Sequence, residues 1–340
     1  MSWKSSTVST LTMMAVLLGG IGCANVFSQS QRNSVAANFS TVSNPIRTLY
    51  GHSAWVYAIA FSPDGRYLAS GSYNKQIKIW SPTDGTLLNT LEGHGDAVVA
   101  LAISSDSKVL ASGSWDNRIK LWQLGTGQIL KTLKGHTDDV EAIALSHNGD
   151  CLVSGSADKT VRVWNVKTGK TVRQLWDGEL VRTVAFSPDG NMVLAGDDSG
   201  SIKIWRISDG ALLATLEAHE RAVRAIAFSP DGQTFASGSA DGTIKLWNWT
   251  THLWRQTLTG HTGAVWSVAF SPDGQTLASS SYDSTVKLWD LSKGKLLSNL
   301  TGHGKSVWAV AFNPTNNMLA SSSSDMSIKL WPLGHKTIVP

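Results

Sequence analysis

Cysteine and charge are both scarce in this chain. Its 340 residues include only two cysteines, Cys23 and Cys151, which excludes a disulfide framework and a cysteine-rich metal site. Charged residues make up 16%, below the roughly 25% of an ordinary globular domain, and the formal net charge is only +4. Because polynucleotide binding needs clustered Lys and Arg, we expect no nucleic-acid partner. Hydrophobic residues, at 42%, still suffice for a large core, which argues against a disordered chain.

The first 44 residues lack acidic side chains altogether and carry only two basic ones, Lys4 and Arg32. The remaining residues hold 27 basic and 25 acidic side chains, so that part of the chain is almost neutral. An apolar run from Leu11 to Ile21 follows Lys4, and small residues follow the run. This order is typical of a secretory signal. The run is too short to span a bilayer, which needs about 20 residues.

Two routes of processing stay open for this leader. Cleavage after Ala24 would release a soluble protein. Alternatively, residues 20–23 resemble a bacterial lipobox, in which Cys23 becomes lipidated and anchors the chain, although Gly20 stands where a Leu is usual. We predict a leader over residues 1–24 and a flexible linker over 25–44. The expected location is periplasmic, membrane-anchored or secreted, and a cytoplasmic protein with an apolar N-terminus is the alternative.

Tryptophan, by contrast, is abundant, and seven of the 15 tryptophans recur at a nearly constant interval. They are Trp80, Trp122, Trp164, Trp205, Trp247, Trp289 and Trp331. The interval is 42 residues at every step except the third, where it is 41. Gly-His pairs such as Gly93-His94 keep the same phase, and short β-rich runs alternate with turns such as residues 271–274, Ser-Pro-Asp-Gly. Four strands fit each interval.

These markers resemble the WD40 repeat, with its Gly-His pair, Ser-Pro-Asp-Gly turn and closing Trp-Asp-like pair. The resemblance covers residues 45 to about 334 and implies an all-β, seven-bladed WD40 β-propeller of four-stranded sheets, followed by a short tail at 335–340. The turns and the leader are similar to those of bacterial members of the family. Only nine residues follow Trp331, too few to reach another outer strand. We therefore predict that a strand at about 46–49 completes blade seven and closes the ring.

Histidine, serine and aspartate also recur once per repeat, which could suggest metal binding or hydrolysis. The copies fall on different blades, however, and buried equivalent sets lack the accessible nucleophile and oxyanion hole of a hydrolase. We predict no catalytic residue, no metal site and no cofactor. The family resemblance instead implies structural tetrads, in which His bonds the Asp and the Ser, and the Ser also bonds the Trp. These are His94, Ser112, Asp116, Trp122; His136, Ser154, Asp158, Trp164; His219, Ser237, Asp241, Trp247; His261, Ser279, Asp283, Trp289; and His303, Ser321, Asp325, Trp331. The first repeat carries His52, Ser70 and Trp80, with Asn74 in place of Asp.

The fourth repeat departs from this pattern. Alignment with the fifth repeat places Gly178-Glu179 at the Gly-His position, Ala195 at the Ser position and Ser199 at the Asp position, so that only Trp205 remains. Neutral drift explains such a loss. The other interpretation is a partner-binding loop built from Trp176, Asp177, Glu179, Asp197 and Asp198.

Three positions per repeat should point to the face that, by resemblance, commonly binds partners in such propellers. Aromatic residues occupy these positions on repeats six, seven, one and two, and charged residues occupy them on repeats three to five. Trp, Tyr and Arg dominate the hot spots of protein interfaces. The predicted partner-binding residues are Trp55, Tyr57, Tyr73, Trp115, Glu141, Arg182, Asp198, Arg224, Trp266, Tyr282 and Trp308.

These observations favour a monomeric, non-enzymatic scaffold that binds other proteins or peptides during assembly of a complex. Contact with a membrane is expected only through a lipid on Cys23. Aromatic side chains also stack on sugars. A carbohydrate- or small-ligand-binding propeller outside the cytoplasm, with or without hydrolytic activity, is therefore the alternative.

Overall fold

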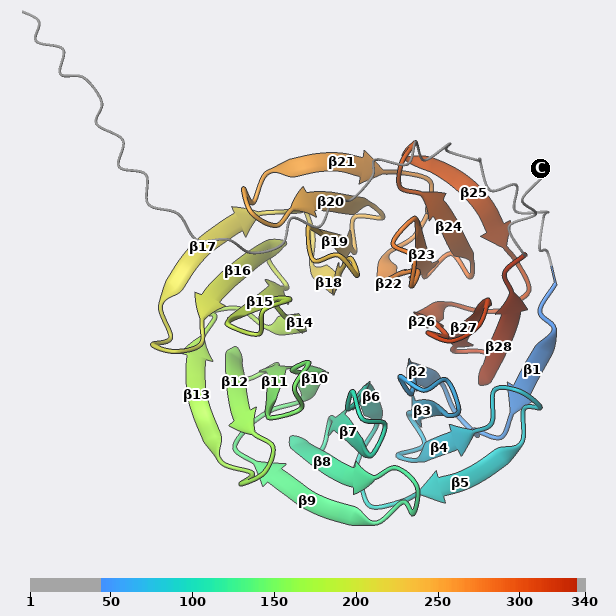
Figure 1. Cartoon of the computed structure of the whole chain (residues 1–340), viewed down its shortest axis with the longest axis horizontal. Coiled ribbons are helices and arrows are strands. Elements are labelled where there is room, and N and C mark those ends of the chain that lie inside the picture. Colours follow the sequence, from blue (N-terminus) through green and yellow to red (C-terminus); the bar gives the residue numbers. More distant parts are fainter. Residues whose placement is uncertain (1–43, 335–340) are drawn as a thin grey trace, which may run out of the picture. The chain divides into compact units, whose positions relative to one another are not determined.

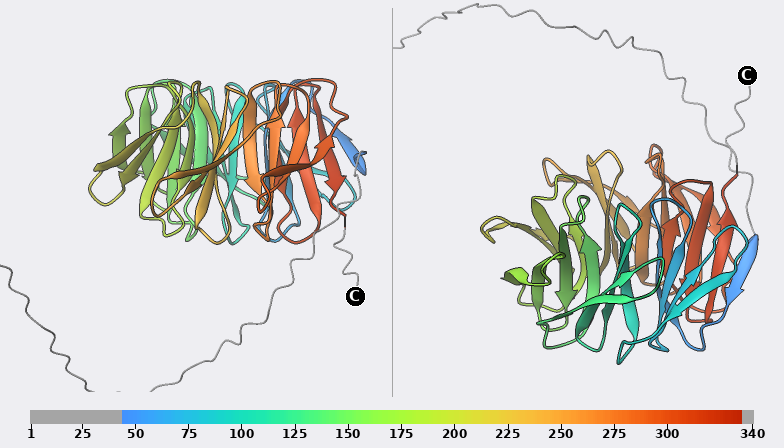
Figure 2. Two further views of the ribbon diagram at one scale, coloured as in Figure 1. Left: turned by 90° about the horizontal axis from the view of Figure 1, so that it is seen from above. Right: turned by 60° about the horizontal axis from the view of Figure 1, so that its bottom comes forward.

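The computed structural model describes residues 44–334. The leader with Cys23, the linker up to residue 43 and the tail at 335–340 lie outside the described residues. The described part contains 28 strands that form seven four-stranded antiparallel sheets. Figure 1 shows these sheets as blades arranged in a ring, and the views in Figure 2 show their loops on two faces. Within residues 44–334, no helix is long and apolar enough to cross a membrane.

Each blade contributes strands a to d, counted from the axis outwards. Blade one comprises β2 (Val56–Phe61), β3 (Leu68–Ser72), β4 (Ile77–Trp80) and β5 (Leu87–Leu91). Blade two comprises β6 (Val98–Ile103), β7 (Val109–Ser114), β8 (Arg118–Gln123) and β9 (Ile129–Lys134). Blade three comprises β10 (Val140–Leu145), β11 (Cys151–Ser156), β12 (Thr160–Asn165) and β13 (Thr171–Trp176). Blade four comprises β14 (Val181–Phe186), β15 (Met192–Asp197), β16 (Ser201–Arg206) and β17 (Leu212–Glu217).

The remaining blades repeat this order. Blade five comprises β18 (Val223–Phe228), β19 (Thr234–Ser239), β20 (Ile244–Asn248) and β21 (Trp254–Leu258). Blade six comprises β22 (Val265–Phe270), β23 (Thr276–Ser281), β24 (Val286–Asp290) and β25 (Lys295–Leu300). Blade seven comprises β26 (Val307–Phe312), β27 (Met318–Ser323), β28 (Ser327–Pro332) and β1 (Arg47–Tyr50). The d–a and b–c loops of all seven blades share one face of the ring.

Blade seven is built from both ends of the described chain. Strand β1 pairs antiparallel with β28, in a register that runs from Arg47 opposite Leu330 to Tyr50 opposite Ser327. The Ile46 N–H also donates to the Leu330 carbonyl at 2.9 Å. The predicted closure by the N-terminal strand is therefore confirmed, as is the seven-bladed fold, with the strand one residue further along than expected.

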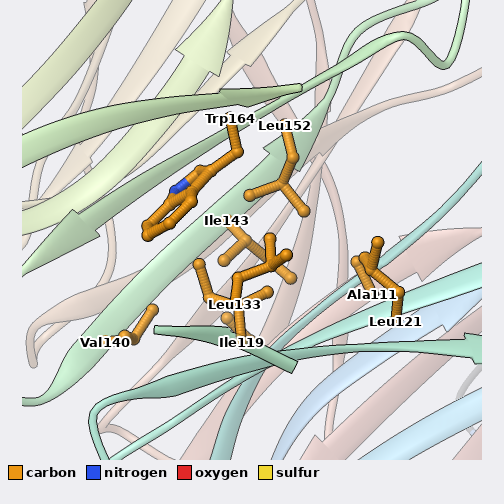
Figure 3. Packing of buried hydrophobic residues seen from close by; sticks show 9 residues of the cluster. Ala111, Ile119, Leu121, Leu133, Val140, Ile143, Leu152 and Trp164 are labelled. Carbon is orange, nitrogen blue, oxygen red and sulfur yellow. The ribbon is translucent and has the colours of Figure 1, made fainter. Parts of the chain in front are cut away.

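The hydrophobic core lies between neighbouring blades. Figure 3 shows one of its clusters, in which Trp164 and Leu152 of blade three meet Ile119 and Leu133 of blade two. All seven repeat tryptophans are at most 5% exposed, so each anchors such a contact. Close approach of the blades also needs glycine. A Cβ at Gly71 would lie only 2.8 Å from Val98 Cγ1 of the next blade.

Candidate functional site

The repeated polar residues meet inside the blades and not on a surface. In blade two, His94 Nε2 lies 2.7 Å from Ser112 Oγ, and its Nδ1 lies 2.8 Å from Asp116 Oδ2. The Trp122 indole N–H donates to the same serine oxygen at 2.8 Å. The matching contacts in blades three, five, six and seven measure 2.7–2.9 Å. Each satisfied bond contributes about 0.5–1.5 kcal/mol to stability, so the tetrads hold the blades together.

Blade one shows what the aspartate contributes. His52 keeps its contact with Ser70 at 2.8 Å, but its Nδ1 lies 3.3 Å from Asn74 Oδ1, where other blades have a carboxylate at 2.8–2.9 Å. Burial, together with the nearby Lys78 charge, lowers the pKa of His52 to about 4, although its hydrogen bonds oppose this shift. His52 is consequently a buried neutral imidazole at pH 7.

Blade four replaces the tetrad with a buried ion cluster. Lys203 Nζ lies 2.8 Å from Asp177 Oδ1 and 3.2 Å from Asp197 Oδ2, and it donates to the Asp177 carbonyl at 2.6 Å. Neither carboxylate side chain is accessible to solvent. Burial raises the pKa of Asp177 to about 6, against the opposing effect of Lys203. The blade has therefore exchanged one polar network for another and has not simply lost its partners.

This geometry corrects the alignment of the fourth repeat. The pairing of Val181 with Asp197 matches the pairing of Val223 with Ser239 in blade five. It places Asp177, and not Glu179, at the position of the missing histidine. Because Asp177 and Asp197 are buried, they are not available to a partner, whereas the side chains of Trp176, Glu179 and Asp198 are exposed.

Six of the predicted aromatic residues form one continuous cluster on the face of the d–a and b–c loops. Ring centroids lie 4.4 Å apart for Trp266 and Trp308, 4.9 Å for Trp308 and Tyr57, and 5.3 Å for Tyr57 and Trp115. Further ring contacts complete the aromatic cluster, which comprises Trp55, Tyr57, Tyr73, Trp115, Trp266 and Trp308. Blades six, seven, one and two supply these residues.

Tyr282 does not join the aromatic cluster. It is 62% exposed, and no ring contact between it and the cluster is found in the described part of the chain. Its equivalents on the neighbouring turns are Ala240 and Ser324, which carry no ring. Tyr282 therefore stands alone on the same face.

The predicted charged residues form a second group beside the first. Arg182 pairs with Glu141 at 3.0 Å and with Asp198 at 2.9 Å, and Arg224 lies 3.9 Å from Asp198. Burial raises the pKa of Glu141, although Arg182 opposes the shift. We call Glu141, Arg182, Asp198 and Arg224 the charged cluster.

The two clusters are contiguous. The Arg224 guanidinium lies 4.7 Å from the centroid of the Trp266 ring, within range of a cation–π interaction. At the other end, the Trp115 Nε1 donor is buried and has no hydrogen-bond partner among the described residues. Most members directly follow the buried valine that begins each innermost strand, so they encircle the axis: Tyr57, Glu141, Arg182, Arg224, Trp266 and Trp308. All predicted residues except Tyr282 thus belong to one surface.

Two further features of the described residues lie apart from these clusters or concern metal binding. Within residues 44–334, no group of three or more His, Cys, Asp or Glu side chains could hold a metal. A cavity of about 390 Å³ between turns of blades six and seven is lined by residues such as Pro272, Phe312 and Leu333, and none of the predicted partner-binding residues lines it.

Comparison with protein-family models accounts for nearly the whole propeller. A model of the WD domain, or G-beta repeat, matches residues 43–81, 85–123 and 127–165. A model described as the first beta-propeller domain of WDR3 matches residues 160–333, just over half of the chain. The chain belongs to the WD40-repeat family.

Similar curated proteins share only short segments with this WD40 protein. It is 44% identical over 45 residues to ribosome assembly protein 4 of Saccharomyces cerevisiae, covering 13% of this chain and 9% of that protein. It is 39% identical over 67 residues to apoptotic protease-activating factor 1 of Rattus norvegicus, covering 19% and 5%. It is 44% identical over 39 residues to the WD repeat-containing protein AAC3 of Dictyostelium discoideum, covering 12% and 8%. These relatives are eukaryotic, so they do not support the bacterial likeness inferred from the turns and the leader.

Proposed function

We propose that this WD40 propeller is a non-catalytic scaffold that binds a protein or peptide through the aromatic and charged clusters. The observation that carries the proposal is the contiguity of these side chains, which seven separate blades bring into one surface. A surface that combines Trp, Tyr and Arg has the composition of an interface hot spot.

The distribution of polar chemistry supports a binding role over a catalytic one. The His-Ser-Asp-Trp sets, which carry the reactive side chains, are enclosed within blades, and the same set is repeated around the ring. The surface residues, in contrast, are aromatic rings and paired charges, with no Ser, Cys, Thr or His among them. The name of one relative refers to ribosome assembly.

An affinity experiment with surface variants tests this proposal. Trp55 and Tyr73 are 45% and 49% exposed, so Trp55→Ala with Tyr73→Ala removes contact area while sparing the core. We expect partner affinity to fall at least about tenfold, because two hot-spot aromatics are lost, with a melting temperature within about 3 °C of the parent. Trp254→Ala on the outer strand β21, where the ring is 58% exposed, is the control and should bind normally.

The readout is mass spectrometry of proteins retained from the native source by the parent and by each variant. Proteins retained by the parent and the control but not by the double variant support the proposal. If the double variant retains the same proteins as the parent, the proposal is contradicted. A glycan-array signal without any protein partner also contradicts the proposal and favours the carbohydrate-binding alternative. We further propose export of the chain, and the mass of its mature N-terminus, lipidated Cys23 or free Asn25, decides between the two processing routes.

A further inference from the structure

Four side chains of the binding face hold buried N–H donors that lack a protein acceptor within residues 44–334. One is Nε1 of Trp115 in blade two, and the other three, which are neighbours, are Nε1 of Trp266, Nε1 of Trp308 and Nε of Arg224. The two indole rings lie 4.4 Å apart, and the Arg224 guanidinium lies 4.7 Å from the Trp266 ring. Blades five, six and seven therefore present these donors side by side.

The chemistry of these atoms restricts what can satisfy them. An indole N–H and an arginine Nε–H only donate, so each needs an acceptor oxygen. A buried donor that stays unpaired costs about 1–3 kcal/mol, which a ligand with suitable oxygens would recover. Trp55 stacks beside Trp308 with ring centroids 6.3 Å apart and is 45% exposed. Trp55 therefore offers an exposed ring directly beside these donors.

Fixed charges of both signs surround the aromatic cluster. On the loops of this face, blades six, seven and one carry Asp283, Asp325, Lys75 and Lys305, and blade two carries Glu92, Asp96 and Asp116. The acidic members of the charged cluster lie on blades three and four, where Arg182 pairs with both. The charge that favours an anionic ligand beside the two indole rings is therefore the guanidinium of Arg224.

The guanidinium of Arg224 is only loosely paired with acidic groups of its own chain. Burial and the like charge of Arg182 lower its pKa, and its nearest acidic partner, Asp198, is 3.9 Å away. A charge-assisted hydrogen bond between arginine and a carboxylate is normally about 2.7–2.9 Å long. The contact with Asp198 is therefore longer than a hydrogen bond, and the Arg224 Nε–H has no acceptor within residues 44–334.

We propose that this face recognises an acidic peptide segment of another protein, with an Asp or Glu carboxylate seated against Trp266, Trp308 and Arg224. Apolar residues beside that carboxylate pack on Trp55 and Tyr73, whose exposed rings lie 5.9 Å apart. This inference rests on the proposed scaffold function and specifies the chemistry of its partner.

Selection from a random dodecapeptide library displayed on phage, with the full chain as bait, tests the inference. We expect the selected peptides to share an Asp or Glu flanked by apolar residues. A selected peptide and its Glu→Met counterpart are then titrated by fluorescence polarisation against the parent and against Trp266→Phe with Trp308→Phe. Phenylalanine keeps an aromatic ring but removes the N–H, and methionine keeps the length of the glutamate side chain but removes its acceptor oxygens. The acidic peptide should bind the double variant at least about tenfold more weakly, and the Met peptide should bind both proteins equally.

Two further variants make the outcome decisive. Arg224→Lys keeps the charge but removes the Nε donor, and it should also weaken the acidic peptide, which covers the case that the double variant is unstable. Trp254→Phe on β21 is the control and should change nothing.

Selected peptides that bind through Trp55 and Tyr73 but carry no acidic preference, or that are rich in Lys and Arg, overturn the inference and leave the scaffold function standing. If the selected peptides bind Trp55→Ala with Tyr73→Ala as tightly as the parent, both the inference and the scaffold function are overturned.

Discussion

A single serine hydroxyl is the centre of each tetrad, because it contacts both the histidine and the tryptophan. In blade six the Ser279 hydroxyl lies 2.8 Å from His261 Nε2 and accepts from the Trp289 indole at 2.8 Å. The aspartate then fixes the other side of the ring through His261 Nδ1, at 2.8 Å. In return, hydrogen bonds from His261 and Thr285 hold the pKa of Asp283 well below its usual value, although burial opposes this. The two side chains are therefore matched, because the carboxylate is held ionised beside the imidazole nitrogen that it contacts.

The substitution Asn74→Asp tests this matching in blade one. The pKa of His52 is about 4 in the folded protein, against about 6.5 in the unfolded chain. Between these values the unfolded chain binds a proton that the folded protein does not, so the free energy of unfolding decreases as pH falls. At pH 4.5 the parent should lose about 2.5 kcal/mol through this residue. A carboxylate at position 74 raises the pKa of His52, and the loss should shrink to less than half.

Urea unfolding at pH 7 and pH 4.5 measures the difference. Asn317→Asp, which adds the same charge at an exposed turn of blade seven, is the control and should keep the full loss of the parent. An equal loss in the parent and in Asn74→Asp would show that a carboxylate does not stabilise the protonated His52.

At the scale of one blade, a buried lysine can replace a buried histidine network. In blade four Lys203 contacts Asp177 and Asp197, whereas its equivalent in blade five, Lys245, donates to the Ala218 carbonyl at 2.6 Å. Asp197 also accepts from the backbone N–H groups of Ser199 and Ser201, so it organises the b–c turn as well. The blade therefore depends on one cation to neutralise two buried carboxylates.

Lys203→Met should destabilise the protein by about 3–5 kcal/mol at pH 7, because it leaves the buried carboxylates of Asp177 and Asp197 without a cation. The sign of the pH effect follows from Asp177, whose folded pKa of about 6 already exceeds its unfolded value. The folded state binds a proton first, so stability contributed by this group rises as pH falls through the folded pKa. Without Lys203 that pKa rises further, and the deficit should shrink between pH 7 and pH 5. Lys245→Met is the control, with a smaller cost and no recovery in acid.

The sequence predicts the blades well and the exceptional blade poorly. A fixed interval, marked by residues such as Trp122 and Trp164, determines where strands begin and end, and counting after Trp331 predicts the closing strand. The loop between Leu175 and Val181 is one residue shorter than its equivalents, and the predicted histidine position was wrong by two residues. His219 precedes Phe228 by nine residues, and the same count back from Phe186 leads to Asp177, so the position was already available in the sequence. What the sequence does not show is the contact of Asp177 with Lys203.

The candidate site was also predicted only in part from the sequence. The spacing rule selected residues of one face, but the contacts among them depend on how adjacent blades pack. Tyr57 meets both Trp308 and Trp115 because its blade lies between theirs, whereas Tyr282 has no ring beside it at the level of its turn. The sequence cannot show that the indole N–H groups of Trp266 and Trp308 lack a partner, because this depends on which acceptors lie near them in the folded protein.

The ring as a whole is closed by four residues. Strand β1 completes the sheet of blade seven, and Leu49, only 4% exposed, packs with Val56 and Trp80 between blades seven and one. Without β1, strand β28 would become an unprotected edge and this cluster would open. A closed ring has no end from which unfolding can begin, whereas an open array of repeats unfolds in parts.

Deletion of residues 45–50 should therefore abolish cooperative unfolding and not merely lower the melting temperature. Circular dichroism and tryptophan fluorescence should give coincident transitions in the parent and separate ones in the deletion variant, since two-state unfolding requires that all probes agree. Tyr50→Ser alters the same strand at a side chain that is 73% exposed, and its transitions should stay coincident. A deletion variant that melts like the parent would show that the packing between blades seven and one closes the ring without β1.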